Sequence, residues 1–204
     1  MYKLKKYKVA RRLGAHLFEK TQTEKFANRT ARRVGKTNQK HGRSMTDFGI
    51  QMMEKQRARA LYGIRERQFG NYVARVIANT SSDPTVQLYE LLETRLDNTV
   101  YRLGFAPTRQ ASRQMVGHGH IRVNGVRKDV ASSTVRVGDV VTIRPGSASS
   151  KMFLDLAERM KGYTAPTWLS VDFGKIEGKV TGAPRLEKGV SNVDFGQIIE
   201  FYKR

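Results

Sequence analysis

The sequence predicts an α+β fold with three parts: a basic N-terminal arm, a mainly helical domain and an inserted helix–helix–hairpin module with small antiparallel strands. Three observations support this prediction. Basic residues crowd the first 80 positions, apolar residues recur at helical spacing from Leu61 to Leu103, and an Asn-Gly pair separates two short alternating segments. We place the arm at 1–46, the module at 93–150, and the helical domain at 47–92 together with 151–204.

The charge of the chain is strongly positive and unevenly distributed. Its 204 residues carry 38 Lys and Arg against 18 Asp and Glu, a formal net charge of +20. Residues 1–80 hold 20 of the basic and only 5 of the acidic residues. Such an excess repels itself unless a polyanion neutralises it, and nucleic acid or an anionic membrane surface would do so. Because 39% of the residues are apolar, the chain can still form a core.

Residues that the chain lacks exclude several classes of protein. It has no cysteine, which rules out disulfides, thiol nucleophiles and cysteine-containing zinc sites. Its four histidines show no metal-ligand spacing, so we expect neither a metal nor a cofactor. No apolar run reaches the ~20 residues that span a bilayer, and the basic N-terminus is not followed by the apolar stretch of a secretory signal. We therefore expect a soluble intracellular protein.

The first 44 residues contain 14 basic and 2 acidic residues, and their apolar side chains are scattered among Lys and Arg. Residues 28–46 have almost nothing to bury. We expect an extended arm with at most short helices. A disordered tail is the plainer alternative, but the interleaved Tyr, Leu and Phe favour an arm that becomes ordered on a partner.

The segment that begins at Asp47 has the apolar spacing of amphipathic helices. Thr46 or Asp47 is a suitable N-cap for the first of them. Gly63 and Gly70 favour two or more helices over a single continuous one. The polar cluster at 78–85, which contains a proline, then marks a turn and a boundary.

The helix–helix–hairpin module follows this boundary. A stripe of Leu and Val at helical spacing runs to Gly104, and Thr108 is the N-cap of a second helix. The segment 121–128, IRVNGVRK, alternates around Asn-Gly, the pair most typical of a tight hairpin, and later valines add strand character. The second helix and its exit loop gather Arg and His beside two glycines that allow close backbone approach. Such a surface suits phosphate and sugar contacts on folded RNA, and a solvated charged helix face is the simpler alternative.

Two segments of the module carry a family resemblance: RLDNTVYRLGFAPTRQASRQMVGHGHIRVNG (95–125) and VRVGDVVTIR (135–144). They resemble the RNA-binding module, of the alpha-L type, in the small-subunit ribosomal protein four family. The segment that precedes the module in bacterial and organellar members resembles DFGIQMMEKQRARALYGIRERQFGNYV (47–73). The C-terminal strands and end of the family resemble PTWLSVDFGKIEGKV (166–180) and IIEFYKR (198–204). These segments occur in family order over nearly the whole chain.

The resemblance implies a structural constituent of the small ribosomal subunit, not an enzyme, that binds rRNA early in assembly and organises its 5′ domain. Within the module, the positions of the RNA-facing signature are Arg95, Arg109, Arg113, His118, Gly119, His120, Arg122 and Asn124. The arm and the helical domain add Lys5, Lys6, Arg11, Arg12, Arg43, Arg57, Arg65, Arg67 and Gln68. Leu96 is interpreted as a core residue and Asp97 as a group that orients its neighbours.

The resemblance also implies protein partners and a location. The fifth small-subunit ribosomal protein is expected to contact residues 166–204, where the net charge is low, at an interface that affects decoding accuracy. Other small-subunit proteins are expected as neighbours, and Arg43 lies near the path by which mRNA enters the subunit. Because 43–46 holds a single Arg, a strong duplex-unwinding role is not expected. The chain matches the cysteine-free type, in the cytoplasm or in an organellar ribosome.

Three other functions compete with this interpretation. The same module occurs on pseudouridine synthases and tRNA synthetases, and Arg95-Leu96-Asp97 resembles the tripeptide of a synthase active site. However, neither a nucleotide-cradling loop nor a nucleophile–base arrangement is present in the sequence. A membrane-surface protein would need a basic amphipathic helix with a bulky apolar face. A stand-alone RNA chaperone would not need the arm, the helical domain and the C-terminal segment.

Overall fold

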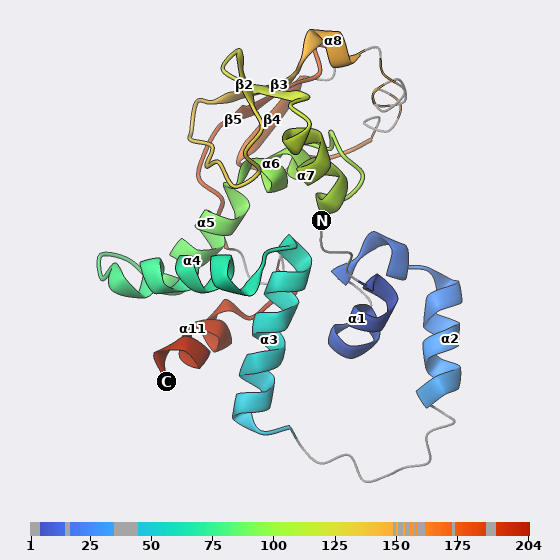
Figure 1. The fold of residues 1–204 in the computed structure, drawn as a ribbon, viewed down its shortest axis with the longest axis vertical. Helices are drawn as coiled ribbons and strands as arrows, with labels where there is room; N and C mark the ends of the chain where they lie inside the picture. Colours follow the sequence, from blue (N-terminus) through green and yellow to red (C-terminus); the bar gives the residue numbers. More distant parts are fainter. Residues whose placement is uncertain are drawn as a thin grey trace. The chain divides into compact units, whose positions relative to one another are not determined.

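The computed structural model of the chain describes residues 5–14, 17–34, 45–148, 150, 153, 156, 158, 162–172, 174–186 and 191–204. The chain divides into two compact units, one from Met1–Thr85 with Glu187–Arg204 and the other from Val86–Leu186 (Figure 1). We call them the helical unit and the module unit. The module unit combines helices with an antiparallel sheet, so the predicted α+β class is confirmed.

The described elements follow the chain in a simple order. The helical unit contains α1 (Lys6–Leu13), η2 (Glu19–Thr21), α2 (Glu24–Val34), α3 (Asp47–Tyr62), α4 (Glu66–Ala78) and α11 (Phe195–Lys203). The boundary between the units falls at the start of α5 (Pro84–Glu93). The module unit continues with α6 (Leu96–Arg102), α7 (Arg109–Gly117), β1 (Ile121–Val123), β2 (Val126–Lys128), β3 (Val140–Ile143), α8 (Pro145–Ala148), β4 (Leu169–Asp172) and β5 (Glu177–Val180).

The predicted helix boundaries in α3 and α7 are confirmed by their capping contacts. Thr46 Oγ1 accepts a hydrogen bond from the backbone N of Gly49 at 3.3 Å, and Thr108 begins α7 in the same way. Gly63 ends α3 in the left-handed conformation, with φ of 63°. The segment 47–78 therefore forms two helices instead of one.

The arm is more structured than the sequence predicts. Its helices bury Leu13, Phe18 and Phe26 in a cluster with partly buried side chains of α3. The apolar residues are scattered in sequence, but helix formation brings them onto one side, where they pack together. Arg57 of α3 stabilises this packing, since its Nε donates a hydrogen bond to the carbonyl oxygen of Leu13 at 2.6 Å.

The C-terminal helix α11 packs on α3 and α4, and polar contacts contribute on both sides. The carboxylate of Glu54, on α3, accepts from the backbone N of Asp194 at 3.1 Å and also pairs with Arg57. The hydroxyl of Tyr202 donates to Glu66, and burial together with this carboxylate raises the pKa of Tyr202 to about 12. The hydroxyl thus stays protonated at neutral pH and keeps its role as donor.

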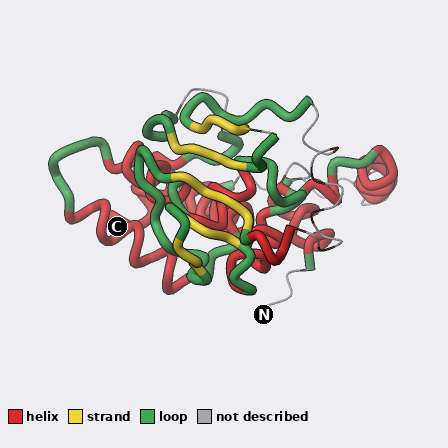
Figure 2. The backbone as a smooth tube through the Cα atoms, turned by 90° about the horizontal axis from the view of Figure 1, so that it is seen from above, coloured by secondary structure: helices red, strands yellow, loops and turns green. Residues whose placement is uncertain are grey.

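The module unit contains a five-stranded sheet in the order β2-β1-β3-β5-β4, and every neighbouring pair is antiparallel (Figure 2). Strands β1 and β2 are joined by Asn124 and Gly125, whose φ values are 50° and 78°. These left-handed conformations are those of a two-residue hairpin turn, so the predicted hairpin is confirmed.

The structure divides the chain at a different place from the prediction. The sequence assigns 151–204 to the helical domain, but β4 and β5 belong to the sheet of the module unit. The reason is the pairing of β5 with β3, in which Val141 lies opposite Gly178, and the burial of Trp168 and Val180 in the same core. Of residues 151–204, only 187–204 belong to the helical unit.

The predicted helical stripe from Leu88 to Leu103 is interrupted. Its two halves are α5 and α6, because the backbone between them bonds to a distant loop. The carbonyl oxygen of Thr94 accepts from the backbone N of Val135 at 2.9 Å, and the backbone N of Leu96 donates to Ser133 at 2.7 Å. Side-chain spacing alone cannot show such a break, since the apolar residues keep the same helical phase on both sides.

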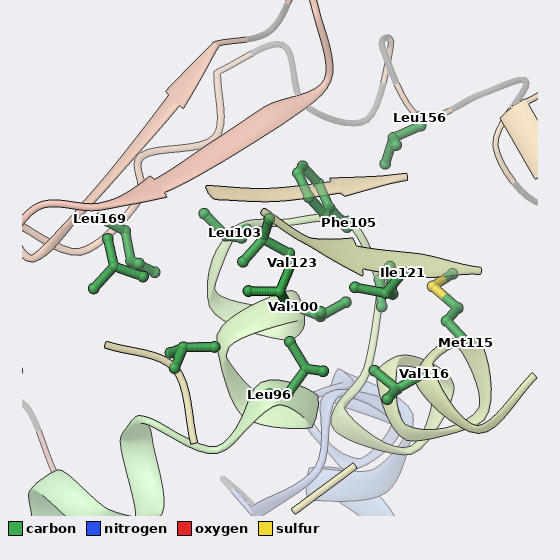
Figure 3. Close-up of a cluster of buried hydrophobic side chains, with 14 of the residues drawn as sticks. Leu96, Val100, Leu103, Phe105, Met115, Val116, Ile121, Val123, Leu156 and Leu169 are labelled. Carbon is green, nitrogen blue, oxygen red and sulfur yellow. The ribbon is translucent and has the colours of Figure 1, made fainter. Parts of the chain in front are cut away.

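The core of the module unit lies between its helices and the sheet. Leu96 and Val100 of α6 and its C-cap Leu103 are fully buried there, together with Val116 of α7 and Ile121 of β1 (Figure 3). The predicted inward orientation of Leu96 is thus confirmed. This core holds the exit loop of α7 and the hairpin in place relative to the helices.

A close contact between β5 and α6 generates a test of the fold. A Cβ atom on Gly178 would overlap the side chain of Leu103, which is fully buried. We expect Gly178→Ala to lower the free energy of unfolding by about 1–3 kcal/mol through overpacking. Gly182→Ala is the matched control, since no heavy atom lies within 4 Å of its added Cβ. Equal thermal and denaturant unfolding of the two variants would contradict this packing.

Candidate nucleic-acid interface

Seven side chains of the α5–α7 segment form one hydrogen-bonded cluster, which we call the carboxylate–guanidinium network. Its members are Glu93, Arg95, Asp97, Asn98, Arg102, Arg109 and Arg113. Glu93 ends α5, Asp97 lies in the first turn of α6, and Arg109 begins α7. Two carboxylates thus face four guanidinium groups, and the network carries an excess of positive charge.

Asp97 is the acceptor at one side of this network. Its Oδ1 accepts from Arg95 Nε at 3.0 Å and from the backbone N of Asn98 at 2.9 Å. Its Oδ2 accepts from Arg95 Nη2 and from Arg113 Nε, both at 2.8 Å. The side chains of Asp97 and Arg95 are only 5% and 3% exposed. Buried charges of this kind persist where they are paired and hydrogen-bonded, as they are here.

Glu93 is the acceptor at the other side. Arg102 donates from Nε and Nη2 to its two carboxylate oxygens at 2.8 and 2.9 Å, and Asn98 Nδ2 donates at 2.9 Å. Asn98 Oδ1 accepts in turn from Arg109 Nε at 2.8 Å. Burial by itself would raise the pKa of Glu93, but the hydrogen bond and charge of Arg102, helped by Arg109, lower it below its ordinary value. Glu93 is therefore ionised at neutral pH.

The network separates the predicted RNA-binding arginines into two kinds. Arg95, which the sequence predicts to face RNA, is buried, and its guanidinium neutralises Asp97. Arg113 is 29% exposed, and Arg109 is partly exposed and lies over the ring of Tyr101 at 4.5 Å. Arg102, which the sequence prediction missed, joins them with 25% of its side chain exposed. The sequence carried one signal for Arg102. Glu93 lies on the apolar side of its helix, where a carboxylate needs a basic partner.

The exit loop of α7 turns at Gly119. Gly119 adopts a φ of +71°, which favours glycine over residues with a Cβ. The guanidinium of Arg127, on β2, also packs against the space that a Cβ at this position would fill. Because Gly119 has no Cβ, the guanidinium of Arg127 lies close to the loop backbone.

Basic side chains converge around this loop. The imidazole Nδ1 of His120 lies 2.9 Å from Ser147 Oγ, and the ring lies 5.9 Å from that of His118. Burial lowers the pKa of His120, and the nearby positive groups of His118, Arg144 and Arg127 lower it further. Arg127 and Arg144 were not predicted, although Arg127 lies in β2 and Arg144 directly follows β3.

The outer face of the sheet adds one more arginine to this group. Ile121 and Val123 of β1 face the core, so Arg122 between them faces outward, directly opposite Arg127 in the register. Like charges in this relation repel, and an anion between them would relieve the repulsion. We call Arg122, Arg127, Arg144, His118 and His120 the hairpin cation cluster.

The side chain of Asn124 stabilises the turn of the hairpin. Its Nδ2 donates to Asp139 Oδ1 at 2.8 Å, and its Oδ1 accepts from the backbone N of Val140 at 2.8 Å. Both polar atoms of the side-chain amide therefore hold the turn against the start of β3. The side chain is exposed, but its contacts are those of a scaffold residue.

The predicted residues of the helical unit lie mostly on its surface. Lys5, Arg11 and Arg12 are exposed on and beside α1, while Lys6 lies over the ring of Phe18 at 5.7 Å. Arg57 is engaged with Glu54 and with the arm, as described above. At the start of α4, the N-cap Arg65 and Arg67 are exposed and Gln68 is partly exposed. Arg43 lies outside the described residues.

Other observations concern the competing functions. The carboxylate of Asp97, in the Arg95-Leu96-Asp97 tripeptide, is held by two guanidinium groups in a buried site rather than opened to a substrate. Among the helices that the structure describes, none is long and apolar enough to cross a bilayer. Within the same described residues, no three His, Asp or Glu side chains are grouped as metal ligands.

Comparison with known proteins places the chain in a family. Residues 94–141 match the family described as "S4 domain", and residues 1–93 match the "Ribosomal protein S4/S9 N-terminal domain". A relative from Roseiflexus castenholzii named "Small ribosomal subunit protein uS4" is 40% identical over 97% of this chain and 96% of its own length.

Two further relatives carry the same name. The one from Herpetosiphon aurantiacus is 43% identical over 79% of this chain and 77% of its own length. The one from Syntrophomonas wolfei is 41% identical over 95% and 94%. The resemblance found in the sequence is thereby confirmed over nearly the whole chain, and so is the prediction that the protein is not an enzyme. The chain belongs to the bacterial-type ribosomal protein S4 family, a family of structural ribosomal proteins.

Proposed function

We propose that this chain is a structural constituent of the small ribosomal subunit that binds rRNA directly and organises its 5′ domain during assembly. The names of the relatives support the subunit, and the matched S4 domain supports RNA binding. The observation that carries the proposal is the concentration of oriented cations on the module unit, in the carboxylate–guanidinium network and the hairpin cation cluster. We propose the cytoplasm as its location, within the small subunit.

The two sets of cations suit a folded RNA in different ways. In the network, guanidinium groups are already oriented by carboxylates before RNA arrives. In the hairpin cation cluster, Arg122 and Arg127 face each other without a carboxylate between them in the strand register. A phosphate group there would remove a repulsion in addition to forming new hydrogen bonds. Contacts of this kind read the shape of the RNA backbone more than its base sequence.

The helical unit would supply long-range attraction and further contacts. Its exposed Lys and Arg, on α1 and at the start of α4, contribute to the excess of basic residues in the first 80 positions. Such an excess increases the rate of association with a polyanion and gives affinity that salt weakens. We propose that this unit holds a neighbouring part of the same RNA.

We also propose protein and mRNA contacts for the helical unit. The contact with the fifth small-subunit protein, through which the chain would affect decoding accuracy, is proposed for residues 166–204. Within them, the ring of Phe201 on α11 lies 5.5 Å from that of Phe48, a side chain of α3 that is 48% exposed. The contact between Arg43 and mRNA rests on the family resemblance alone.

Binding to rRNA should show the salt dependence of phosphate contacts. If about 6–10 phosphates are neutralised, the affinity of the purified chain for a 5′-domain transcript should fall by roughly 10³–10⁵ between 50 and 200 mM salt. Filter binding across this range measures the effect, and footprinting locates the protected nucleotides. A transcript of the 3′ region is the control. A flat salt response, or equal binding of both transcripts, would contradict the proposal.

RNA binding should also depend on pH through the hairpin cation cluster. The pKa of His120 is lowered in the free chain, so the imidazole is mainly neutral at pH 7, and a bound phosphate would raise that pKa. The bound state then holds more protons, so affinity should increase as the pH falls from about 8 to 5.5. A His118→Gln, His120→Gln double variant should show a flatter profile. Identical profiles for the variant and the native chain would exclude these groups from the contact.

A further inference from the structure

The geometry points to Glu93 and Asp97 as positioning residues for RNA binding: the two buried carboxylates hold the guanidinium groups of Arg102, Arg109 and Arg113 in the orientation that RNA phosphates require. This inference rests on the proposed function and deepens it. It assigns a favourable role to acidic residues in a surface that binds a polyanion, where acidic residues would ordinarily weaken binding.

The depth of the charges supports this assignment. The side chains of Glu93 and Asp97 are 0% and 5% exposed, whereas those of Arg102 and Arg113 are 25% and 29% exposed. A phosphate that approaches the surface therefore meets the guanidinium groups, while the carboxylates lie beneath them. The positive groups are in direct contact with the solvent and the negative groups are not.

The hydrogen-bond geometry supports it as well. Arg102 and Arg113 each direct the edge formed by Nε and Nη2 toward a carboxylate. A guanidinium is planar with five donors in a fixed fork, so its opposite edge then points away from that carboxylate. Arg109 is held less directly, by Asn98, whose amide is itself fixed by Glu93.

Orientation before binding has a thermodynamic consequence. A flexible arginine loses side-chain freedom when it binds a phosphate, and this loss opposes binding. In the network the freedom is already lost when the chain folds, so it does not oppose the RNA contact. Arg95 shows the other role in the same network, because at 3% exposure it neutralises Asp97 and is shielded from RNA.

Three variants that each remove one negative charge test this inference. Asp129→Asn, in an exposed loop of the same unit, removes one negative charge and should leave rRNA affinity unchanged or slightly increased. Glu93→Gln and Asp97→Asn make the same charge change in the full chain. If these residues position arginines, both should instead lower affinity by about 3- to 10-fold and reduce the salt slope by about 1. Binding of both variants like Asp129→Asn would overturn the inference.

Folding is measured alongside binding, because Asp97→Asn leaves Arg95 buried without its carboxylate. Thermal unfolding shows whether each variant is folded at the temperature of the binding assay. If Asp97→Asn is not folded, Glu93→Gln decides, since Arg102 is partly open to water and keeps an amide oxygen as acceptor.

A measurement on the native chain needs no variant. The Nε–Hε NMR signals of Arg102, Arg109 and Arg113 should be ordered in the absence of RNA, at the level of the buried Arg95. Mobile side chains would overturn the inference even if every variant unfolds. A native chain that fails to bind rRNA would instead refute the proposed function and leave these NMR signals unaffected, so the two failures are distinguishable.

Discussion

The pairing of Asp97 with two arginines is the interaction on which the module unit most depends. A negative charge in this position is favoured by the N-terminus of α6, but it is buried and needs partners. Arg95 supplies one from the break between α5 and α6, and Arg113 supplies the other from α7. One carboxylate therefore fixes how two helices meet and where a guanidinium reaches the surface.

The same principle explains how a chain with a net charge of +20 keeps a defined binding surface. Positive charge that is merely abundant is mobile and self-repelling, as on an exposed helix face. In the module unit, by contrast, Arg102 and Arg113 are held by Glu93 and Asp97, and Arg127 packs against Gly119. The first 80 residues hold most of the excess charge, but the module unit holds charge at defined positions. In the proposed function, the first part of the chain would therefore supply most of the electrostatic attraction and the module unit the oriented contacts.

Local features of the fold were predictable from the sequence because they depend on neighbours in the chain. The N-caps Thr46 and Thr108 and the Asn124-Gly125 turn are of this kind. The features that were not predicted depend on distant partners. The break at 94–95 comes from bonds to 133–135, and the assignment of β4 and β5 comes from pairing with β3.

The candidate site shows the same division. The sequence pointed to the second helix, the exit loop and the hairpin, but could not tell which arginines reach the surface. The sequence alone does not distinguish Arg95 from Arg102. In the structure, Arg95 pairs with Asp97 and is buried, whereas Arg102 pairs with Glu93 and is partly exposed. Arg127 was missed because its proximity to Gly119 arises across the hairpin.

In the proposed arrangement, Asp97 acts on RNA binding through Arg113. A double-mutant cycle tests it directly, with rRNA affinity measured for Asp97→Asn, Arg113→Gln and the double variant. If Asp97 positions Arg113, the double variant should bind about as well as Arg113→Gln alone, because the carboxylate has no arginine left to orient. Strictly additive losses would show that the two residues act independently and would contradict the account.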